Sequence, residues 1–389
     1  MDSSPSASRV AELLLAGPRG RRLLLEYALA SELAQHPVRS EDSFGQAVIY
    51  AAHWLDPDVI GGRALRMQSA FGWFDSLFGD VAAELDIPEV TATEVAERLG
   101  AVELLEPTPV VLRNALVAAV DSARYWQEPD GADILASTPE MSGALQRVAH
   151  HITAPPHTTW WCTPVDISAQ YALQWEDILP KTVPDDVHAA LLTARRRERA
   201  EEHIARTERD PDPTANWSGE WGSHPPLTLP SSTRLLGDGS PAGLWLVEDS
   251  LGWEQAVSVE LIVPKGMSVF EIENAADWAK LCARFPIEVT AQKRHDWFRT
   301  TGRAGRWVVP DWVQVAEHYD GVHLQVGAYL GAAGVAIPVD DSTGTASVIA
   351  GWNPDETYWF SSDIAYDQEH IQWVLVDAGA DMVWKPAST

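Results

Sequence analysis

The chain has 389 residues, a length at which one hydrophobic core usually gives way to two or more domains. Hydrophobic residues make up 46% of the chain and charged residues 22%, a balance that excludes intrinsic disorder, collagen and coiled coil. Acidic residues outnumber basic residues by 56 to 28, and the resulting net charge of -28 makes general binding to nucleic acids or anionic membranes unfavourable.

Cysteine content and hydropathy bear on the cellular compartment. The two cysteines, Cys162 and Cys282, are too few for a disulfide framework or a structural zinc cluster. The first residues lack the apolar run of a secretory signal, and no stretch approaches the roughly 20 apolar residues of a membrane span. We therefore expect a cytoplasmic protein without a membrane partner.

Residues 1–130 predict a helical domain. Apolar side chains recur there at intervals of three and four residues, for example at Val10, Leu13 and Leu14, which is the period of helices with one buried face. Residues that precede prolines mark the expected helix ends. After two initial helices, we expect helices over residues 42–56, 63–85, 91–99 and 109–126.

Residues 131–210 predict a helix, a strand and a second helix that connect two larger regions. A hydroxyl cap, a first-turn proline and a carboxylate occupy residues 137–140, so a helix is expected from there to about His151. Residues 157–166 are rich in β-branched and aromatic side chains, which favours a strand. Mixed charges at helical spacing predict an exposed helix over residues 183–209.

Residues 211–230 have the Pro-, Gly- and Ser-rich composition of a linker or of a long ordered loop. Beyond them, residues 231–389 alternate short strand patterns with helical ones, which predicts an α+β domain with a largely antiparallel sheet. The expected strands cover 242–249, 256–264, 268–273, 322–330, 346–352 and 356–361, and the expected helices cover 274–285 and 311–319.

Two residues of the C-terminal region are the main candidates for chemistry, since no P-loop, dinucleotide fingerprint, metalloprotease or nucleophile-elbow motif is present. Glu356 enters an aromatic strand after a turn, where a carboxylate would acquire a raised pKa or bind a sugar hydroxyl. Arg234 follows three hydroxyl residues, an arrangement that suits a phosphate or a ribose. The alternatives are a surface turn at Glu356 and an edge-strand arginine before a hairpin at Arg234.

Residues 292–307 form a basic cluster that includes Arg303, which would attract an anionic ligand in this acidic chain. The alternative is a solvated loop that pairs with the nine acidic residues of the segment 330–389. His318, Asp320 and His323 offer metal-ligating groups, but their spacing matches no standard motif, and a helix-to-strand turn is the favoured interpretation.

The segments SARYWQEPDGAD, TTWWCTPVDISAQYALQW and SSTRLL to GWNPDETYWF resemble a family of uncharacterised actinobacterial proteins. More distantly, the C-terminal element order resembles the ADP-ribosyltransferases. In that superfamily a first strand carries an Arg or His, a middle strand a hydroxyl or aromatic residue, and a late strand the catalytic Glu, gathered in a split sheet that holds NAD. The matching positions here are Arg234, Ser250 and Glu356.

The resemblance implies a division of roles around NAD. Arg234 would hold the diphosphate or ribose, and Glu356 would bind the ribose 2′-hydroxyl and stabilise the oxocarbenium-like transition state. Trp245 or Trp359 would stack on the nicotinamide, and Arg303 is the further candidate for the anionic part of the cofactor. The chain differs from that superfamily in lacking a Ser-Thr-Ser run on the middle strand.

Three functional hypotheses follow. The first is an NAD-dependent transferase of the ADP-ribosyl type with a regulatory or targeting helical half. The second is a non-catalytic interaction, immunity or sensing protein on the same scaffold, with a basic protein as a candidate partner for its acidic, Trp-rich surface. The third is a carbohydrate-binding protein, because tryptophan and carboxylates also line sugar clefts.

Overall fold

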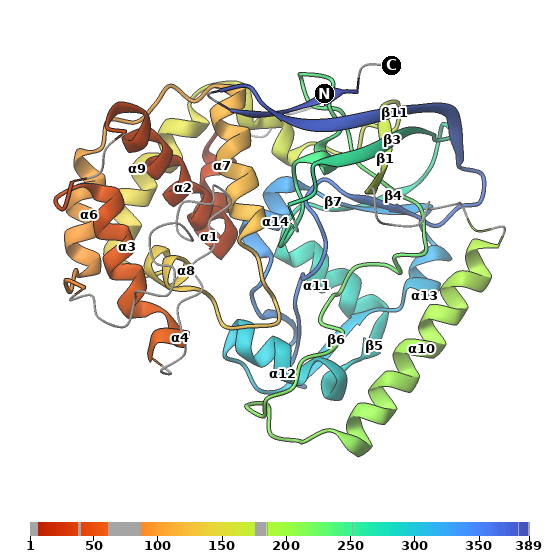
Figure 1. The fold of residues 1–389 in the computed structure, drawn as a ribbon. Coiled ribbons are helices and arrows are strands. Elements are labelled where there is room, and N and C mark those ends of the chain that lie inside the picture. The colour runs from red at the N-terminus through yellow and green to blue at the C-terminus, as the bar shows by residue number, and fades with distance from the viewer. Residues whose placement is uncertain are drawn as a thin grey trace.

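The structure, a computed structural model, describes residues 7–37, 40–60, 87–175, 184, 186–250, 252–379 and 381–387 (Figure 1). Its first half is helical, as the sequence predicts, although the helix expected over 63–85 lies outside the described residues. The elements are α1 (Ala7–Ala16), α2 (Pro18–Gln35), α3 (Phe44–Leu55), α4 (Pro57–Ile60), α6 (Ala92–Ala101), α7 (Pro109–Asp121), α8 (Gly131–Ala136), η1 (Pro139–Met141), α9 (Ser142–Thr153) and η2 (Pro156–Cys162).

The second half mixes three four-stranded sheets with helices, which confirms the α+β class. Of the nine strand pairings in the described residues, two are parallel. The sheet orders are β1-β3-β11-β12, β2-β10-β7-β4 and β5-β6-β9-β8. The elements are β1 (Gln170–Trp175), α10 (Val187–Glu208), β2 (Ser231–Ser232), η3 (Ala242–Leu244), β3 (Gln255–Ile262), β4 (Val269–Ile272), α11 (Ala275–Arg284), β5 (Pro286–Glu288), α12 (Thr290–Thr301), β6 (Arg306–Pro310), α13 (Trp312–Ala316), β7 (Gly321–Leu324), α14 (Val326–Ala332), β8 (Ile337–Asp340), β9 (Thr345–Ser347), β10 (Thr357–Trp359), β11 (Ala365–Asp377) and β12 (Met382–Pro386).

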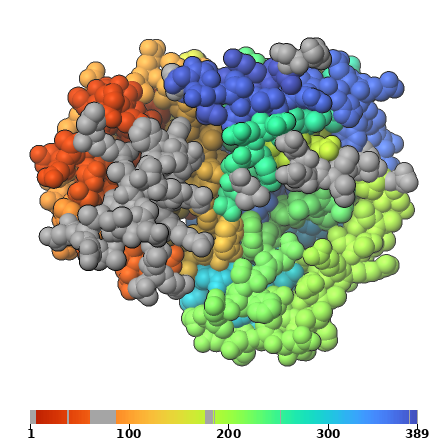
Figure 2. Space-filling model, in the orientation of Figure 1, coloured from red at the N-terminus to blue at the C-terminus, as the bar shows by residue number. Residues whose placement is uncertain are grey.

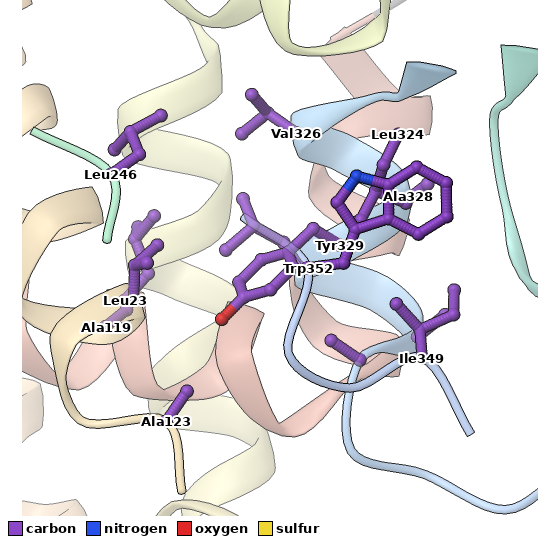
Figure 3. Close-up of a cluster of buried hydrophobic side chains, with 14 of the residues drawn as sticks. Leu23, Ala119, Ala123, Leu246, Leu324, Val326, Ala328, Tyr329, Ile349 and Trp352 are labelled. Atoms are coloured by element: carbon purple, nitrogen blue, oxygen red, sulfur yellow. The ribbon is translucent and has the colours of Figure 1, made fainter. Parts of the chain in front are cut away.

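One large hydrophobic cluster includes residues of both halves. Helix α14 packs against α1 and α2, and the fully buried Tyr329 and Trp352 share a cluster with Leu23 of α2 (Figure 3). The approach is close enough that a Cβ atom on Gly17 would clash with the carbonyl oxygen of Leu330. The helical part and the sheets are therefore packed as one body at this junction.

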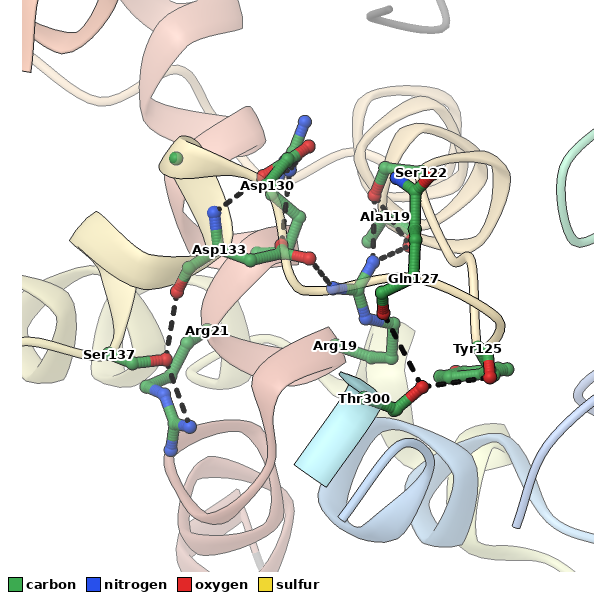
Figure 4. A network of polar contacts seen from close by, with 12 residues as sticks. Arg19, Arg21, Ala119, Ser122, Tyr125, Gln127, Asp130, Asp133, Ser137 and Thr300 are labelled. Atoms are coloured by element: carbon green, nitrogen blue, oxygen red, sulfur yellow. Dashed lines mark hydrogen bonds and ion pairs between the residues drawn. The ribbon is translucent and has the colours of Figure 1, made fainter. Parts of the chain in front are cut away.

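A buried ionic network stabilises the helical part (Figure 4). Arg19 and Arg22 of α2 are 3% and 4% exposed, and both bind Asp133 of α8. Arg19 also donates to Ser122 at the end of α7 (2.8 Å), while Arg22 binds Asp130, the N-cap of α8 (3.0 Å). Because each buried guanidinium faces carboxylates, the network fixes how α2, α7 and α8 pack together.

The C-terminal hairpin reaches back to the helical part. Strands β11 and β12, dark blue in Figures 1 and 2, lie along one edge of the molecule from α7 to the far end of the sheets. The amide of Asn114 on α7 donates to Asp381, which precedes β12 (2.8 Å). The helical part thus contacts the sheet part in two places, at α14 and at the turn before β12.

Two predicted strands are wrong. Residues 157–166 mostly form the 3-10 helix η2, because Thr159 and Thr163 turn their hydroxyls back onto carbonyl oxygens three residues earlier and so stabilise tight turns (2.8 and 2.9 Å). Residues 242–249 form η3 and irregular chain. There the backbone N–H of Gly243 donates to the hydroxyl oxygen of Thr233, ten residues earlier (2.9 Å), so this donor is not available to a neighbouring strand.

Two further expectations are corrected in part. Residues 322–330 begin as β7 but continue as helix α14, and the basic segment 292–307 is mostly helix α12 rather than a loop. Residues 211–230 are a long loop packed against the sheet part, and the buried ammonium of Lys293 donates to the carbonyl oxygen of Gly222 (2.8 Å). Buried donors from α12 hold this loop in place, which is consistent with an ordered loop.

Candidate functional site

A cavity of about 330 Å³ lies where the helical half meets the sheet half. One wall is a single face of α7, formed by residues at helical spacing: Pro109, Leu112, Arg113 and Leu116. The other walls come from η2 and from the turn after β2. The remaining lining residues are Val110, His157, Trp160, Trp161, Leu236, Gly237, Asp238 and Leu246.

Arg113 is the cationic group of this cavity, and its guanidinium lies over a tryptophan ring. Its guanidinium carbon is 3.7 Å from the ring centre of Trp245, within the range of a cation–π contact. Its Nη1 donates to Oδ2 of Asp238 at 2.7 Å, and the side chain of Asp238 is 46% exposed. The predicted nicotinamide partner Trp245 is thus 9% exposed and covered by Arg113.

Arg234 lies next to the cavity without lining it. Its guanidinium carbon is 5.4 Å from the ring centre of Trp160, which does line the cavity. Its Nε donates to Oδ1 of Asp355 (2.6 Å) and its backbone N–H to Oδ2 (3.0 Å). Nη1 donates to the Thr163 hydroxyl (2.8 Å), and Nη2 lies near the carbonyl oxygens of Thr163 and Pro164 (3.4 and 3.2 Å). Every nitrogen of this guanidinium is therefore engaged.

Strand pairing explains why Arg234 meets Asp355 and not Glu356. Ser232 of β2 is paired with Thr357 of β10, and continuing this register by two residues places Arg234 opposite Asp355. Asp355 precedes the strand in a left-handed conformation, whereas the side chain of Glu356 lies on the side of Tyr358, two residues further along. The carboxylate of Glu356 instead interacts with the hydroxyl of Tyr358. Burial and this negative charge both raise the pKa of Tyr358.

A buried histidine extends the Arg234 contacts into a chain of charges. His323 of β7 is 1% exposed and lies between Glu271 of the adjacent β4 (2.7 Å) and Asp355 (3.4 Å). Burial alone would lower the pKa of His323, but hydrogen bonds to the two carboxylates and their negative charges raise it to about 9. The imidazole is therefore charged at neutral pH, and it lowers the pKa of both carboxyl groups against their burial.

Asp355 adopts a left-handed backbone conformation with φ of 64°. Such a conformation is uncommon outside glycine, although Asp and Asn tolerate it best. The strain persists because the side chain of Asp355 receives Arg234 and His323 while its backbone N–H donates to the carbonyl oxygen of Leu324 (2.8 Å). This closed arrangement is typical of a structural ion network as much as of a functional one.

The other predicted site residues lie apart. Ser250 lies near the end of α7, where its backbone N–H donates to Oδ1 of Asp121 (2.8 Å). Trp359 is fully buried, and its indole N–H donates to Ser232 (2.8 Å). Arg303 donates to the carbonyl oxygen of Gly344 and stacks on Trp307 in the sheet that contains β6. None of these three lines the cavity beside Trp160.

The basic cluster finds carboxylates outside the segment 330–389. Lys293 pairs with Glu198 (3.7 Å), Arg299 with Asp296 (2.6 Å) and Arg306 with Glu288 (3.7 Å). The alternative of intramolecular neutralisation is thus seen, but with different partners from those expected.

The region predicted as a helix-to-strand turn holds no metal site in the described residues, where no group of three or more His, Cys, Asp or Glu is placed to hold an ion. Nδ1 of His318 instead contacts the carbonyl oxygen of Gln314 (3.0 Å), and Asp320 accepts from the backbone N–H of Ser268 (2.7 Å). Among the same residues, no helix is long and apolar enough to cross a membrane.

Sequence reasoning missed the residues that define the cavity. Arg113 was one position of an ordinary helical pattern, and Trp160 and Trp161 were assigned to a strand. The signal that marks them is the pair of adjacent tryptophans in a short Pro- and Thr-rich segment, since large aromatic side chains there need a partner surface. The partner surface is α7, some 45 residues earlier in the chain.

Comparison of the chain with protein-family models, with curated proteins and with solved structures finds no match.

Proposed function

We propose that the protein is a non-catalytic binding or sensing protein that takes a small, largely apolar ligand in the cavity between α7, η2 and the turn after β2. The observation that supports the proposal is the cavity itself, which has a volume of about 330 Å³ and is walled mainly by aliphatic and aromatic side chains with a few polar groups among them. Pockets of this size and composition are the usual form of small-molecule sites.

We favour binding over catalysis because the buried ionisable groups His323 and Asp355, whose pKa values are shifted, do not line the cavity. His323 and Asp355 are held in a closed ion network, 1% and 2% exposed, and His323 is bound on both ring nitrogens. A general acid or base needs to reach the substrate, and a side chain engaged on all sides does not. The cavity walls supply contact surface and one anchored cation.

The position of the cavity suits a sensor. A ligand there would contact Leu116 of the helical half and Leu236 of the sheet half at the same time. Binding would tie the two halves together more tightly, because a ligand that binds the folded state raises its stability in proportion to its affinity and concentration. Ligand binding would thereby change the stability with which α7 packs against the sheet half.

The test is the binding of N-phenyl-1-naphthylamine, an uncharged dye that fluoresces in apolar sites. We expect saturable fluorescence with the wild-type protein and its loss in Leu236→Trp, which places a larger side chain in the cavity. Leu227→Trp is the matched control, since Leu227 is 58% exposed and does not line the cavity. Equal dye binding in all three proteins would overturn the proposal.

A second candidate is NAD-dependent ADP-ribosyl transfer, on an ADP-ribosyltransferase-like fold. The observation in its favour is that Arg234 bonds to Asp355, so that Arg234 and Glu356 lie at the same corner of the β2–β10 pair. For NAD to bind there, Arg234 would have to release Asp355. The test is turnover of NAD by the wild type and by Glu356→Gln: loss of turnover in the variant, with unchanged thermal stability, supports this candidate, and no turnover by the wild type removes it.

A further inference from the structure

We infer that the ligand of this cavity carries a carboxylate that binds Arg113, and that Asp238 is an internal competitor which the ligand displaces. The inference rests on the proposed function, since it names the class of ligand for the same cavity. It assigns to the turn after β2 the role of a counter-ion that keeps Arg113 neutralised until an organic anion with an apolar body enters.

Arg113 has donor capacity to spare. Of the five N–H groups of a guanidinium, only the one on Nη1 toward Asp238 has an acceptor in the part of the chain that the structure describes. Its Nε is buried without any acceptor there. The side chain is 11% exposed, so the cation is mostly removed from water yet incompletely bonded. A carboxylate satisfies a guanidinium well, because it accepts two parallel hydrogen bonds.

The turn fixes Asp238 through one carboxylate oxygen and leaves the other oxygen, which binds Arg113, replaceable by a ligand. Oδ1 of Asp238 accepts from the backbone N–H and the hydroxyl of Ser240 (3.0 and 2.6 Å), and the same hydroxyl accepts from the indole N–H of Trp245 (2.8 Å). Oδ2 alone reaches Arg113. A ligand carboxylate can therefore replace Oδ2 at Arg113 while Oδ1 and Trp245 keep the turn intact.

The cavity wall is less negative than the chain as a whole, because Arg113 and Asp238 balance each other there. Asp238 is the one acidic residue among those that line it, whereas Arg113 lines it and His157 lies exposed at its edge. In a chain with net charge -28, such a wall is a local exception. Because the side chain of Asp238 is 46% exposed, its ion pair is screened by water and is weak enough for a ligand to compete with it.

The experiment compares two probes of the same shape, 2-naphthoate and uncharged 2-naphthamide, by calorimetric titration of the full-length protein near neutral pH. We expect the wild type to prefer 2-naphthoate. Asp238→Asn should bind 2-naphthoate about tenfold more tightly, because the competing charge is gone, and should therefore prefer 2-naphthoate over 2-naphthamide more strongly than the wild type does. Glu273→Gln is the matched control, as Glu273 pairs with Arg9 at 2.8 Å outside the cavity, and it should change neither affinity.

Arg113→Met keeps most of the side-chain length without the charge and should lose the preference for 2-naphthoate. Equal affinities for the two probes in the wild type, or no gain for 2-naphthoate in Asp238→Asn, would overturn the inference while leaving the apolar cavity as a binding site. Failure of both probes together with failure of the naphthylamine dye would instead remove the proposed function. Asp238→Asn alters an exposed side chain, so the inference stays testable even if Arg113→Met does not fold.

Discussion

Two arginines near the same cavity illustrate how differently one residue type can be used. Arg113 and Arg234 are similarly buried, with 11% and 13% of their side chains exposed, and each has an aspartate oxygen within 2.7 Å and a tryptophan ring nearby. Their partners differ, since Asp355 is 1% exposed and Asp238 is 46% exposed. The burial of the carboxylate, rather than that of the arginine, separates a fixed ion pair from an exchangeable one.

The second difference is the number of guanidinium nitrogens that donate hydrogen bonds to protein acceptors. Arg234 uses all its nitrogens on protein acceptors, whereas Arg113 uses one. A buried ion pair whose donors are all bonded holds β-strands in position. Removing either charge leaves the other unpaired in the protein interior, where it is poorly solvated. An unsaturated pair with a solvated partner costs little to open, and it leaves donors for a ligand. The same substitution made at both aspartates should therefore have opposite consequences.

The largest effect is expected at Asp355. Asp355→Asn keeps the side-chain shape and tolerates the left-handed backbone, but it leaves the charges of Arg234 and His323 short of a counter-ion. We expect a loss of roughly 3–5 kcal/mol in the free energy of unfolding, the usual range for breaking a buried ion pair. Urea denaturation at neutral pH measures it. A loss below about 1 kcal/mol would mean that the network is not structural.

Glu248 is a buried carboxyl that forms no ion pair in the described part of the chain. Burial raises its pKa from the usual 4.5 to about 8, although the hydroxyl of Tyr329 and the charge of Arg19 act to lower it. Between these values the unfolded chain releases the proton and the folded protein retains it, so stability falls as pH rises, by at most about 1.4 kcal/mol per pH unit. Glu248→Gln should remove this component, and the variant should gain on the wild type from pH 5 to pH 8 in thermal denaturation.

His323 should produce a smaller fall at higher pH. Its pKa is raised from 6.5 to about 9, so its contribution to stability is complete below the unfolded value and is lost as the pH passes through 9. The free-energy difference between the wild type and His323→Gln should therefore shrink from pH 6 to pH 10. A difference that stays constant over this range would show that the imidazole is not charged in the folded protein.

Part of this arrangement was predictable from the sequence, and the division follows the range of the interactions. Helices α3, α6, α7 and α10 and strands β3, β4 and β10 follow from local periodicity and caps, such as the capping box of Thr91 and Glu94. Segment 157–166 was assigned to the wrong class because its Thr hydroxyls bind nearby carbonyl oxygens and favour a tight helix over a strand.

The site was predictable only in part, for reasons of register. Arg234 and Glu356 were singled out by composition, but the carboxylate that Arg234 binds is that of Asp355, the neighbour of Glu356. Which of the two acidic residues faces Arg234 depends on the pairing of β2 with β10, and a shift of one residue reverses the side to which each side chain points. The contact of Arg113 with Asp238 joins residues 125 positions apart and is set by packing alone, so no local pattern indicates it.

The smallest stability effect is expected at Asp238, where the comparison is sharpest. Asp238→Asn makes the same chemical change as Asp355→Asn, but the lost partner is exposed, so the free energy of unfolding should change by less than about 1 kcal/mol. The asparagine side-chain oxygen can still accept from Ser240, which preserves the turn. Urea denaturation of the two variants side by side measures the contrast. A cost at Asp238 equal to that at Asp355 would place both arginines in the structural class and would leave Arg113 no freedom to exchange its partner for a ligand.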